Sequence, residues 1–189
     1  MREYNPIKKN IIATTVIKTP LGDMFCAATN KGICILSFFK QKNLEDQIQR
    51  VQKFFKAEAI PAHNKYFDCL QKELDEYFEG KRIDFTVPLQ LVGTSFQQSA
   101  WKILMSIPYG ETISYKEEAA LLKNPKAVRA VGSANGKNMI SIIIPCHRVI
   151  QTGGKLGGYA GGLDKKEALL ELENNHSSDI IRKNHSHEH

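Results

Sequence analysis

The 189-residue sequence predicts an α+β protein, with a mixed α/β domain over residues 1–92 and a helical domain over residues 93–175. In the first domain, runs rich in β-branched residues alternate with apolar residues at helical spacing. From residue 93 the apolar pattern becomes helical, and two short helices follow each other across a tight turn, as in a helix-turn-helix. Residues 176–189 are polar, and we expect them to form a disordered tail.

A small sheet covered by helices is the simplest arrangement for the first domain. A strand is predicted over residues 11–17, which are rich in β-branched side chains, and two more over 24–29 and 33–39. The last two flank Asn30-Lys31-Gly32, which is typical of a hairpin turn. Two helices are predicted by apolar residues three and four apart: 44–55 and 67–78. Gly80 is placed to end the second helix, and residues 84–89 are expected to return as a strand.

The second domain is predicted to begin with three helices. The first has one apolar face, formed by Phe96, Ala100, Ile103, Leu104 and Ile107. Ser114 and Glu117 form a capping-box signature at the start of the second helix. Asn124 is expected to cap the third helix, with Pro125 in its first turn, so that barely two residues separate these helices. A last helix is predicted over residues 165–173.

The third helix, residues 126–134, is rich in small side chains, and Arg129 is the only long one between Lys126 and Lys137. A helix that reads base edges normally presents Asn, Gln, Arg or Lys. This composition therefore favours close, sequence-neutral contact with DNA, and the net charge of +6 fits a polyanionic partner. Two alternatives stay open: the small residues pack against another helix, and the basic charge is only a solvated surface.

The segment Pro145-Cys146-His147-Arg148 predicts a reactive cysteine. It follows the apolar run at residues 140–144, which we expect to be a buried strand that presents Cys146 at its end. The thiolate is the nucleophilic form, and nearby cations lower the pKa of a thiol. The alternative is a small buried hydrophobic residue, which is what we expect for the other three cysteines: Cys26, Cys34 and Cys69.

Composition points to a cytoplasmic protein without a membrane partner. No apolar run approaches the ~20 residues of a membrane helix, and Met1-Arg2-Glu3-Tyr4-Asn5 lacks the hydrophobic segment of a secretory signal. The four cysteines have no paired spacing, which fits a reducing compartment. The glycine-dense loop at residues 153–162 permits close backbone approach to a ligand but lacks a phosphate-loop pattern.

Eight motifs occur in order along the second domain: Gly93-Thr94-x-Phe96-Gln97, Trp101, Ile107-Pro108-x-Gly110-Glu111-Thr112, Ser114-Tyr115, Arg129-Ala130-Val131-Gly132, Ala134-Asn135-Gly136-x-Asn138, Pro145-Cys146-His147-Arg148-Val149 and Gly158-Tyr159-Ala160-Gly161-Gly162-Leu163. In these motifs the chain resembles the methylated-DNA–protein-cysteine methyltransferases, and the resemblance ends near Glu173. The first domain matches more loosely, mainly at Thr19-Pro20-Leu21-Gly22. The resemblance implies a ribonuclease-H-like α/β domain followed by a helix-turn-helix, winged-helix-like domain.

The resemblance implies stoichiometric repair of O6-alkylguanine, and also of O4-alkylthymine, in double-stranded DNA, with Cys146 as the alkyl acceptor that is spent after one reaction. His147 and Glu173 would draw off the thiol proton through water, and Asn138 would orient the turn that carries the cysteine. Tyr115 would assist the departing guanine and contact DNA. Arg129 would fill the gap left by the flipped nucleotide. Further DNA contacts are implied for Lys126, Ala127, Ala130 and Gly132, and a substrate pocket for Tyr159, Ala160, Met139 and Val149.

Two departures from the family pattern limit what carries over. Ala160 stands where vertebrate members have serine, so only a role of its backbone amide is implied. Some members bind zinc in the first domain, but Cys26 and Cys34 lack accompanying histidines, so we expect no metal and no cofactor. We expect a monomer. The alternatives are a cysteine hydrolase, a non-catalytic helix-turn-helix DNA-binding protein, and a lesion binder of the class that replaces the acceptor cysteine.

Overall fold

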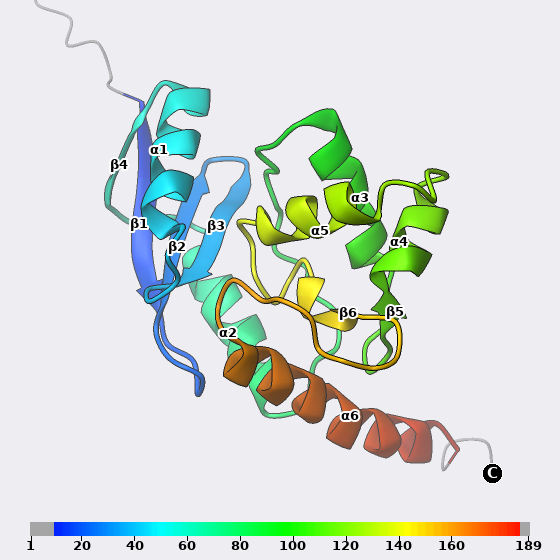
Figure 1. The fold of residues 1–189 in the computed structure, drawn as a ribbon. Coiled ribbons are helices and arrows are strands. Elements are labelled where there is room, and N and C mark those ends of the chain that lie inside the picture. Colours follow the sequence, from blue (N-terminus) through cyan, green and yellow to red (C-terminus); the bar gives the residue numbers. More distant parts are fainter. Residues whose placement is uncertain (1–9, 186–189) are drawn as a thin grey trace, which may run out of the picture.

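The computed structural model describes residues 10–185, and Figure 1 shows the sheet at the left of the molecule and a cluster of helices at the right. Residues 1–9 and 186–189 lie outside the described part. The prediction that residues 1–5 form no secretory signal and the prediction for the end of the tail therefore concern residues that are not described. The α+β class is confirmed, with the strands of the main sheet preceding the helical half in the chain.

The main sheet contains the three predicted strands: β1 (Ile11–Ile17), β2 (Met24–Thr29) and β3 (Gly32–Phe38). They form an antiparallel meander, because β2 pairs with both β1 and β3. A fourth strand, β4 (Glu58–Pro61), pairs in parallel with the other edge of β1, so that the strand order is β3-β2-β1-β4. This strand gives little signal in the sequence because it has only four residues and ends in proline.

Two helices of the first half are as predicted: α1 (Leu44–Phe55) and α2 (Phe67–Phe78). Successive residues of a strand point to opposite faces, and the sheet accordingly contributes to two apolar clusters. One cluster joins Ile12 to Val51 of α1. The other joins Met24 to Leu70 of α2 and continues into the helical half through Trp101. The two halves therefore share a core.

β3 is an edge strand of the sheet, yet all seven of its residues are buried. Two isolated bridges cover its free edge, one between Ile33 and Leu89 and the other between Leu36 and Ile140. Each of the segments 84–89 and 140–144 thus pairs with β3 through a single residue. The prediction of a strand in each segment is wrong.

Backbone chemistry explains why these two segments do not extend into strands. Pro88 has no N–H to continue a ladder, although its carbonyl accepts a hydrogen bond from Ile33 at 2.8 Å. Ile142 adopts a left-handed conformation, with φ of 72°, so the chain turns instead of remaining extended. The turn directs the following residues, including Cys146, toward the helical half.

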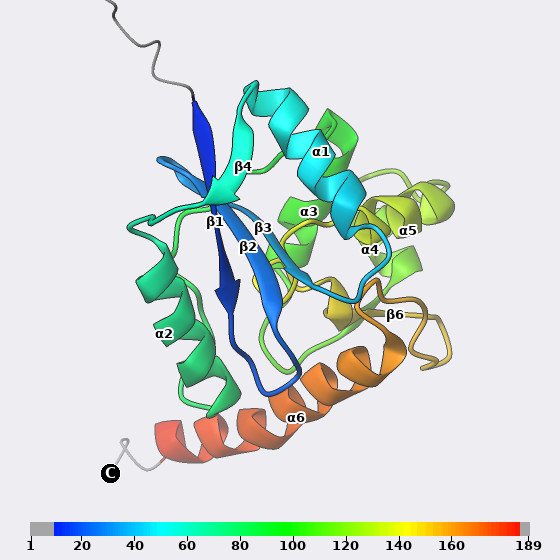
Figure 2. The ribbon, with the colours of Figure 1, turned by 90° about the vertical axis from the view of Figure 1, so that its left-hand side faces the viewer.

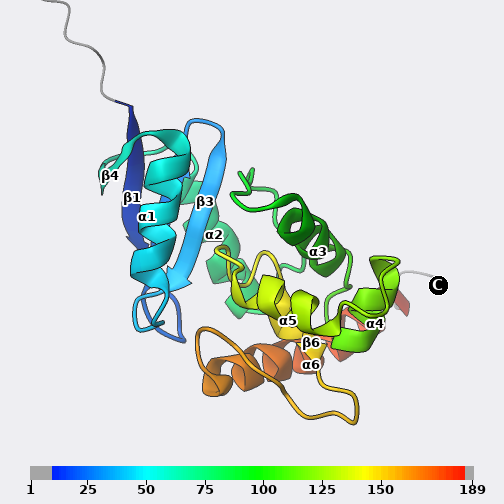
Figure 3. The same cartoon turned by 45° about the horizontal axis from the view of Figure 1, so that its top comes forward.

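The helical half begins with three helices that Figure 3 shows grouped beside β3: α3 (Ser95–Met105), α4 (Tyr115–Leu121) and α5 (Val128–Gly136). Thr94 and Gln97 form a reciprocal capping box at the start of α3. Ser114 accepts a hydrogen bond from the Glu117 N–H at the start of α4, where the sequence predicts a cap. Trp101 donates its indole N–H to the Ala134 carbonyl at 2.9 Å, which fixes α3 against α5.

The turn between α4 and α5 is longer than predicted and spans residues 122–127. Lys123 adopts a φ of 59°, and the Asn124 N–H donates to the Ala119 carbonyl at 3.0 Å. Asn124 therefore ends α4, and its predicted role as the cap of α5 is wrong. Because a residue before proline avoids the helical region, Pro125 delays the next helix, which starts after Ala127 without a side-chain cap.

The last helix, α6 (Leu163–His185), is much longer than the predicted one, so residues 176–185 are helical and not disordered. Its extension is packed: a Cβ added to Gly80 would lie 1.9 Å from the His176 ring, and one added to Gly110 would lie 2.7 Å from the Ser177 Cβ. Figure 2 shows α6 running beneath the sheet toward the end of α2. Within residues 10–185, no helix is both long and apolar enough to cross a membrane.

Candidate active site

Cys146 begins a short 3₁₀ helix, η1 (Cys146–Arg148), directly after the turn at residues 140–144. Asn138 joins the two ends of that turn, because its Nδ2 donates to the Ile144 carbonyl at 2.9 Å and its Oδ1 accepts from the Ile140 N–H at 3.0 Å. The Asn138 side chain is buried, so these bonds replace those to water. The turn that carries the cysteine is therefore fixed by one amide side chain.

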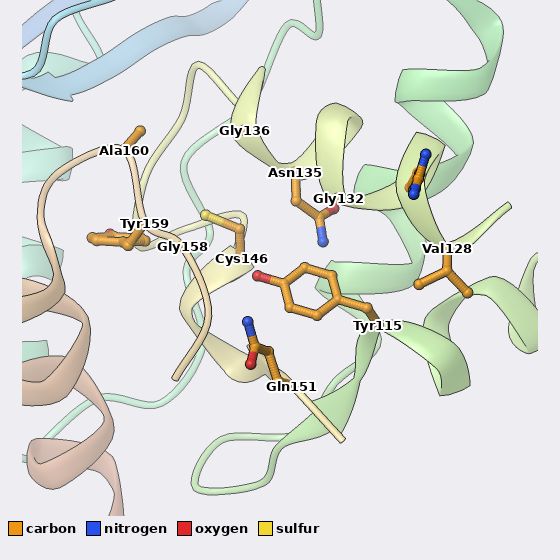
Figure 4. A pocket seen from close by; sticks show the side chains of 11 residues that line it. Tyr115, Val128, Gly132, Asn135, Gly136, Cys146, Gln151, Gly158, Tyr159 and Ala160 are labelled. Carbon is orange, nitrogen blue, oxygen red and sulfur yellow. The ribbon is translucent and has the colours of Figure 1, made fainter. Parts of the chain in front are cut away.

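A small parallel ribbon brings Tyr115 to the same place. Strand β6 (Val149–Ile150), which follows η1, pairs with β5 (Ile113–Ser114), which precedes α4. Tyr115 is the first residue of α4, and Figure 4 shows its hydroxyl directed toward Cys146. Two segments about thirty residues apart in the sequence thus meet at the cysteine.

A buried carboxylate lies behind Cys146. Oε2 of Glu173, on α6, lies 2.6 Å from His147 Nε2, and Oε1 accepts from Arg148 Nε at 2.7 Å. The Tyr77 hydroxyl also donates to Oε2, at 2.6 Å. Burial by itself raises the pKa of Glu173, but the hydrogen bonds from His147 and Arg148 and the charge of Arg148 outweigh it and hold the pKa at about 2. Glu173 is therefore ionised at neutral pH.

His147 is poised as a base. Burial lowers its pKa, and the opposing effect of Glu173 does not overcome this, so the ring is neutral at pH 7. Because ionised Glu173 can only accept, Nε2 carries the proton that faces it. Nδ1 then bears the lone pair, and this buried atom has no hydrogen-bond partner among the described residues. The neutral ring can accept one proton at Nδ1.

The sequence predicts that positive charges on His147 and Arg148 lower the pKa of the Cys146 thiol. The structure shows a different electrostatic setting. Burial raises the pKa of Cys146, while Asn138 and Lys166 act to lower it. Arg148 is engaged with Glu173 and His147 is neutral, so neither supplies the expected positive field. The resting thiol is protonated, and a base has to remove its proton before it can react.

Lys166 is a site residue that the sequence analysis did not identify. It is fully buried on α6, where Nζ donates to the Val149 carbonyl at 2.7 Å and to the Gly158 carbonyl at 3.1 Å. Burial lowers its pKa to about 8, and the charge of Cys146 acts in the opposite direction. The signal available in the sequence was spacing: Lys166, Leu169 and Glu173 are three and four residues apart and share the buried face of α6.

Cys146 opens into a pocket of about 610 Å³ (Figure 4). Its lining residues come from α4, α5, η1, the residue after β6 and the glycine-rich loop: Tyr115, Val128, Arg129, Gly132, Asn135, Gly136, Cys146, Gln151, Gly158, Tyr159 and Ala160. Burial raises the pKa of both Tyr115 and Tyr159, so both phenols stay protonated and can donate hydrogen bonds. Gly157 allows the loop to approach, because a Cβ there would lie 3.0 Å from the Tyr115 ring and the φ is 72°.

The predicted DNA-contacting residues fall on the pocket or beside it. Arg129 and Gly132 line the pocket, and Arg129 is exposed on α5. Lys126 and Ala127 lie in the turn before α5, and Ala130 is exposed on the helix next to Arg129. The outer face of α5 thus presents small side chains and one guanidinium.

Two predicted pocket residues lie elsewhere. Met139 and Val149 are buried in the two apolar clusters and do not line the cavity. Both adjoin residues that do shape the site, Asn138 and Arg148, but their own side chains point into the core. Five lining residues have no predicted role: Val128, Asn135, Gly136, Gln151 and Gly158.

The other cysteines differ from one another. Cys26 and Cys34 are buried in the sheet, as predicted, and burial raises the pKa of both, that of Cys34 to about 12. Cys69 is exposed on α2, so the prediction that it is buried is wrong. It therefore provides a thiol outside the pocket against which the reactivity of Cys146 can be measured.

Comparison with known proteins agrees with this geometry. A family model described as the ribonuclease-like domain of 6-O-methylguanine DNA methyltransferase matches residues 12–91, and one described as its DNA binding domain matches residues 95–175. The chain is 46% identical over 164 residues to a methylated-DNA–protein-cysteine methyltransferase of Methanosarcina barkeri, covering 85% of this chain and 96% of that relative. An inducible enzyme of the same name from Bacillus subtilis is 39% identical over 158 residues, covering 84% and 88% of the two chains.

Solved structures give the same result. Mycobacterium tuberculosis OGT in complex with DNA superposes with a TM-score of 0.75 at 41% identity, over 87% of this chain and 94% of that one. A second structure, of Mycobacterium tuberculosis O6-methylguanine methyltransferase, superposes with a TM-score of 0.74 at 40% identity, over 88% and 94% of the two chains. With identity of this extent over both halves, the chain belongs to the methylated-DNA–protein-cysteine methyltransferase family.

Proposed function

We propose that this protein repairs O6-alkylguanine in double-stranded DNA by transferring the alkyl group to the sulfur of its own Cys146. The observation that carries the proposal is the arrangement around this thiol. It lies in a cavity of about 610 Å³ with two neutral phenols, next to a buried histidine whose Nδ1 is free to accept a proton. No other described cysteine lines this cavity.

The alkylated base has to enter the pocket for the reaction. A base stacked in duplex DNA cannot reach the sulfur, so the nucleotide has to be flipped out, at a cost of a few kcal/mol. Arg129, exposed at the pocket, is the residue placed to occupy the space that the base leaves in the duplex. The small residues Ala127, Ala130 and Gly132 let α5 approach the groove closely, and Lys126 adds a positive charge for phosphate.

Alkyl transfer forms one bond and breaks one. The Cys146 thiol gives its proton toward His147 Nδ1, through a water molecule, and Glu173 stabilises the imidazolium that results. The thiolate attacks the alkyl carbon, forming S–C while the C–O6 bond breaks with its electron pair staying on the guanine. The Tyr115 hydroxyl donates a hydrogen bond to the guanine as negative charge develops. The departing guanine takes up one proton and His147 gives one up, so that the thiol proton ends on the base and both groups are neutral. Ala160 also lines the pocket, and because its side chain has no hydrogen-bond donor, a hydrogen bond from this residue to the base would come from its backbone amide.

The product is a thioether at Cys146, and no described group is placed to cleave it, so each molecule acts once. O4-alkylthymine likewise carries its alkyl carbon on an exocyclic oxygen of the base, and we extend the proposal to this base. We also propose that the protein works as a monomer in the cytoplasm. A reducing compartment would keep the four free thiols reduced.

Stoichiometry tests the proposal against two of its alternatives, the cysteine hydrolase and the non-catalytic helix-turn-helix protein. A duplex containing O6-methylguanine is supplied in excess, and the modified nucleoside that remains is quantified by chromatography after digestion. Loss of one methyl group per protein molecule, followed by a plateau, is the expected result. Continued turnover would indicate a cysteine hydrolase or another catalyst, and binding without loss of the methyl group would indicate a non-catalytic helix-turn-helix protein.

A further inference from the structure

Another buried carboxyl group lies behind Asn135, one of the residues that line the pocket. Glu118 on α4 is fully buried, and its Oε2 accepts a hydrogen bond from Asn135 Nδ2 at 2.7 Å. Asn135 itself is buried on α5 but lines the cavity that contains Cys146. This contact joins the two helices of the helix-turn-helix at the pocket wall.

If Glu118 is ionised, polar atoms of the Glu118–Asn135 pair lack hydrogen-bond partners. The second oxygen of Glu118, Oε1, has no hydrogen-bond partner among the described residues, and neither has Asn135 Oδ1. A buried carboxylate with one hydrogen bond and no cation is costly. Burial accordingly raises the pKa of Glu118 to about 7, against a smaller lowering effect of Asn135. A protonated Oε1 removes the charge and gives the group a donor.

The charge state of Glu118 affects the reacting groups. A negative charge at Glu118 raises the pKa of Cys146 and also that of Tyr115 on its own helix. From α5 the contact is with the uncharged Asn135, and no cation of the packed elements offsets the Glu118 charge within the described chain. When Glu118 is ionised, the thiolate of Cys146 is therefore harder to form.

We propose that Glu118 is a positioning residue that functions as a neutral acid: in this form it holds Asn135 at the pocket wall, and its ionised form opposes the Cys146 thiolate and slows alkyl transfer. The inference deepens the proposed function and rests on it. Glu118 acts through Asn135 and through its charge, not by contact with the substrate.

The sign of the pH effect follows from this arrangement. Below about pH 7 Glu118 is largely protonated, and replacing it with uncharged Gln changes the thiol's surroundings little. Above that pH the wild-type carboxylate raises the pKa of Cys146, whereas Gln cannot. The rate ratio of Glu118→Gln to wild type should therefore grow with pH.

The experiment measures single-turnover methyl transfer from a duplex containing O6-methylguanine, with protein in saturating excess, at about pH 6 and about pH 8.5. For Glu118→Gln we expect the rate of the variant divided by that of the wild type to be near unity at the lower pH and about three to ten at the higher pH. The control is Glu117→Gln, an exposed carboxylate on the same helix, whose ratio should stay near unity at both. A Glu118→Gln ratio that does not change with pH would overturn the inference.

A second measurement on the wild-type protein does not depend on the variant folding or on alkyl transfer. The side-chain carboxyl carbon of Glu118, assigned through its own Cγ–Hγ correlations by NMR, should titrate near pH 7. Titration below about pH 5, the ordinary range of a glutamate, would refute the role as a neutral acid. If the wild type accepts no methyl group while Glu118 titrates near pH 7, the proposed function is refuted, but the assignment of Glu118 as a neutral acid stands.

Discussion

His147 Nε2 lies 2.6 Å from Glu173 Oε2, and both side chains are buried behind the reactive cysteine. The residues are 26 positions apart in the sequence, one on η1 and the other on α6. The same carboxylate accepts hydrogen bonds from Arg148 and Tyr77. Glu173 thus fixes the histidine tautomer that leaves Nδ1 free, and it also neutralises a buried guanidinium.

Glu173→Gln is expected to impair both stability and reaction. An amide cannot balance the Arg148 charge, and the unfolding free energy should fall by about 3 kcal/mol, as for a broken buried ion pair. Transfer should slow at least about tenfold, because the imidazolium of His147 loses its counter-charge. Urea unfolding and single-turnover rates measure the two effects. Glu171→Gln, at an exposed position on the same helix, is the control and should change neither.

The pH dependence of stability follows from the depressed pKa of Glu173, about 2 against an ordinary 4.5. A depressed carboxyl pKa contributes stability that is fully present above the unfolded-state pKa and is lost as pH falls through the folded-state value. The difference corresponds to a loss on the order of 3 kcal/mol between about pH 4.5 and pH 2. Urea unfolding across this range should show a steep fall for the wild type and a shallower one for Glu173→Gln; equal slopes would contradict the assignment.

Lys166→Met should slow alkyl transfer at neutral pH, and the increase of the transfer rate with pH should occur at a higher pH than in the wild type. Methionine matches the lysine stem in length but removes the cation that lowers the Cys146 pKa, and also the two hydrogen bonds to the Val149 and Gly158 carbonyls. The rate is measured as a function of pH. Lys165→Met is the control, because Lys165 interacts with Asp164 and the Phe38 ring away from the thiol. An unchanged pH profile in Lys166→Met would exclude the electrostatic role.

Arg129→Ala should reduce repair of duplex DNA much more than reaction with free O6-benzylguanine. The guanidinium is exposed at the pocket and is assigned to the duplex, whereas a free base needs no flipping. Loss of the side chain removes support for the flipped state, so we expect a decrease of at least about tenfold on the duplex, corresponding to 1.4 kcal/mol. Equal losses on the two substrates would remove Arg129 from this role.

The sequence predicts most of the fold because its signals are local. The hairpin of β2 and β3 and the amphipathic helices α1 and α2 follow from alternation and helical spacing. Errors occur where long-range contacts determine the conformation. The run at residues 140–144 is apolar like a strand, but it bridges β3 only at Leu36 and turns at Ile142, whose φ is 72°. The end of α6 is polar, but it remains helical where His176 and Ser177 meet two glycines.

The site shows the same division. Cys146, His147 and Arg148 are adjacent in the sequence, and their motif identifies the nucleophile. The environment of the thiol could not be predicted, because it depends on which partner each charge meets: Arg148 turns to Glu173, and the cation near the sulfur is Lys166 from another helix. Glu118 and Asn135 each look ordinary in the sequence, and only packing of α4 on α5 makes them a buried pair.

The central claim is that the Cys146 sulfur accepts the alkyl group, and the most direct test is to locate the label after reaction. The protein is incubated with a duplex containing O6-methylguanine, digested, and analysed by peptide mass spectrometry. We expect one added methyl group, on the peptide that contains Cys146, with the exposed thiol Cys69 unmodified in the same sample. Cys146→Ser should fold, bind the duplex and gain no methyl group. A methyl group on Cys69, or transfer that persists in Cys146→Ser, would contradict the account.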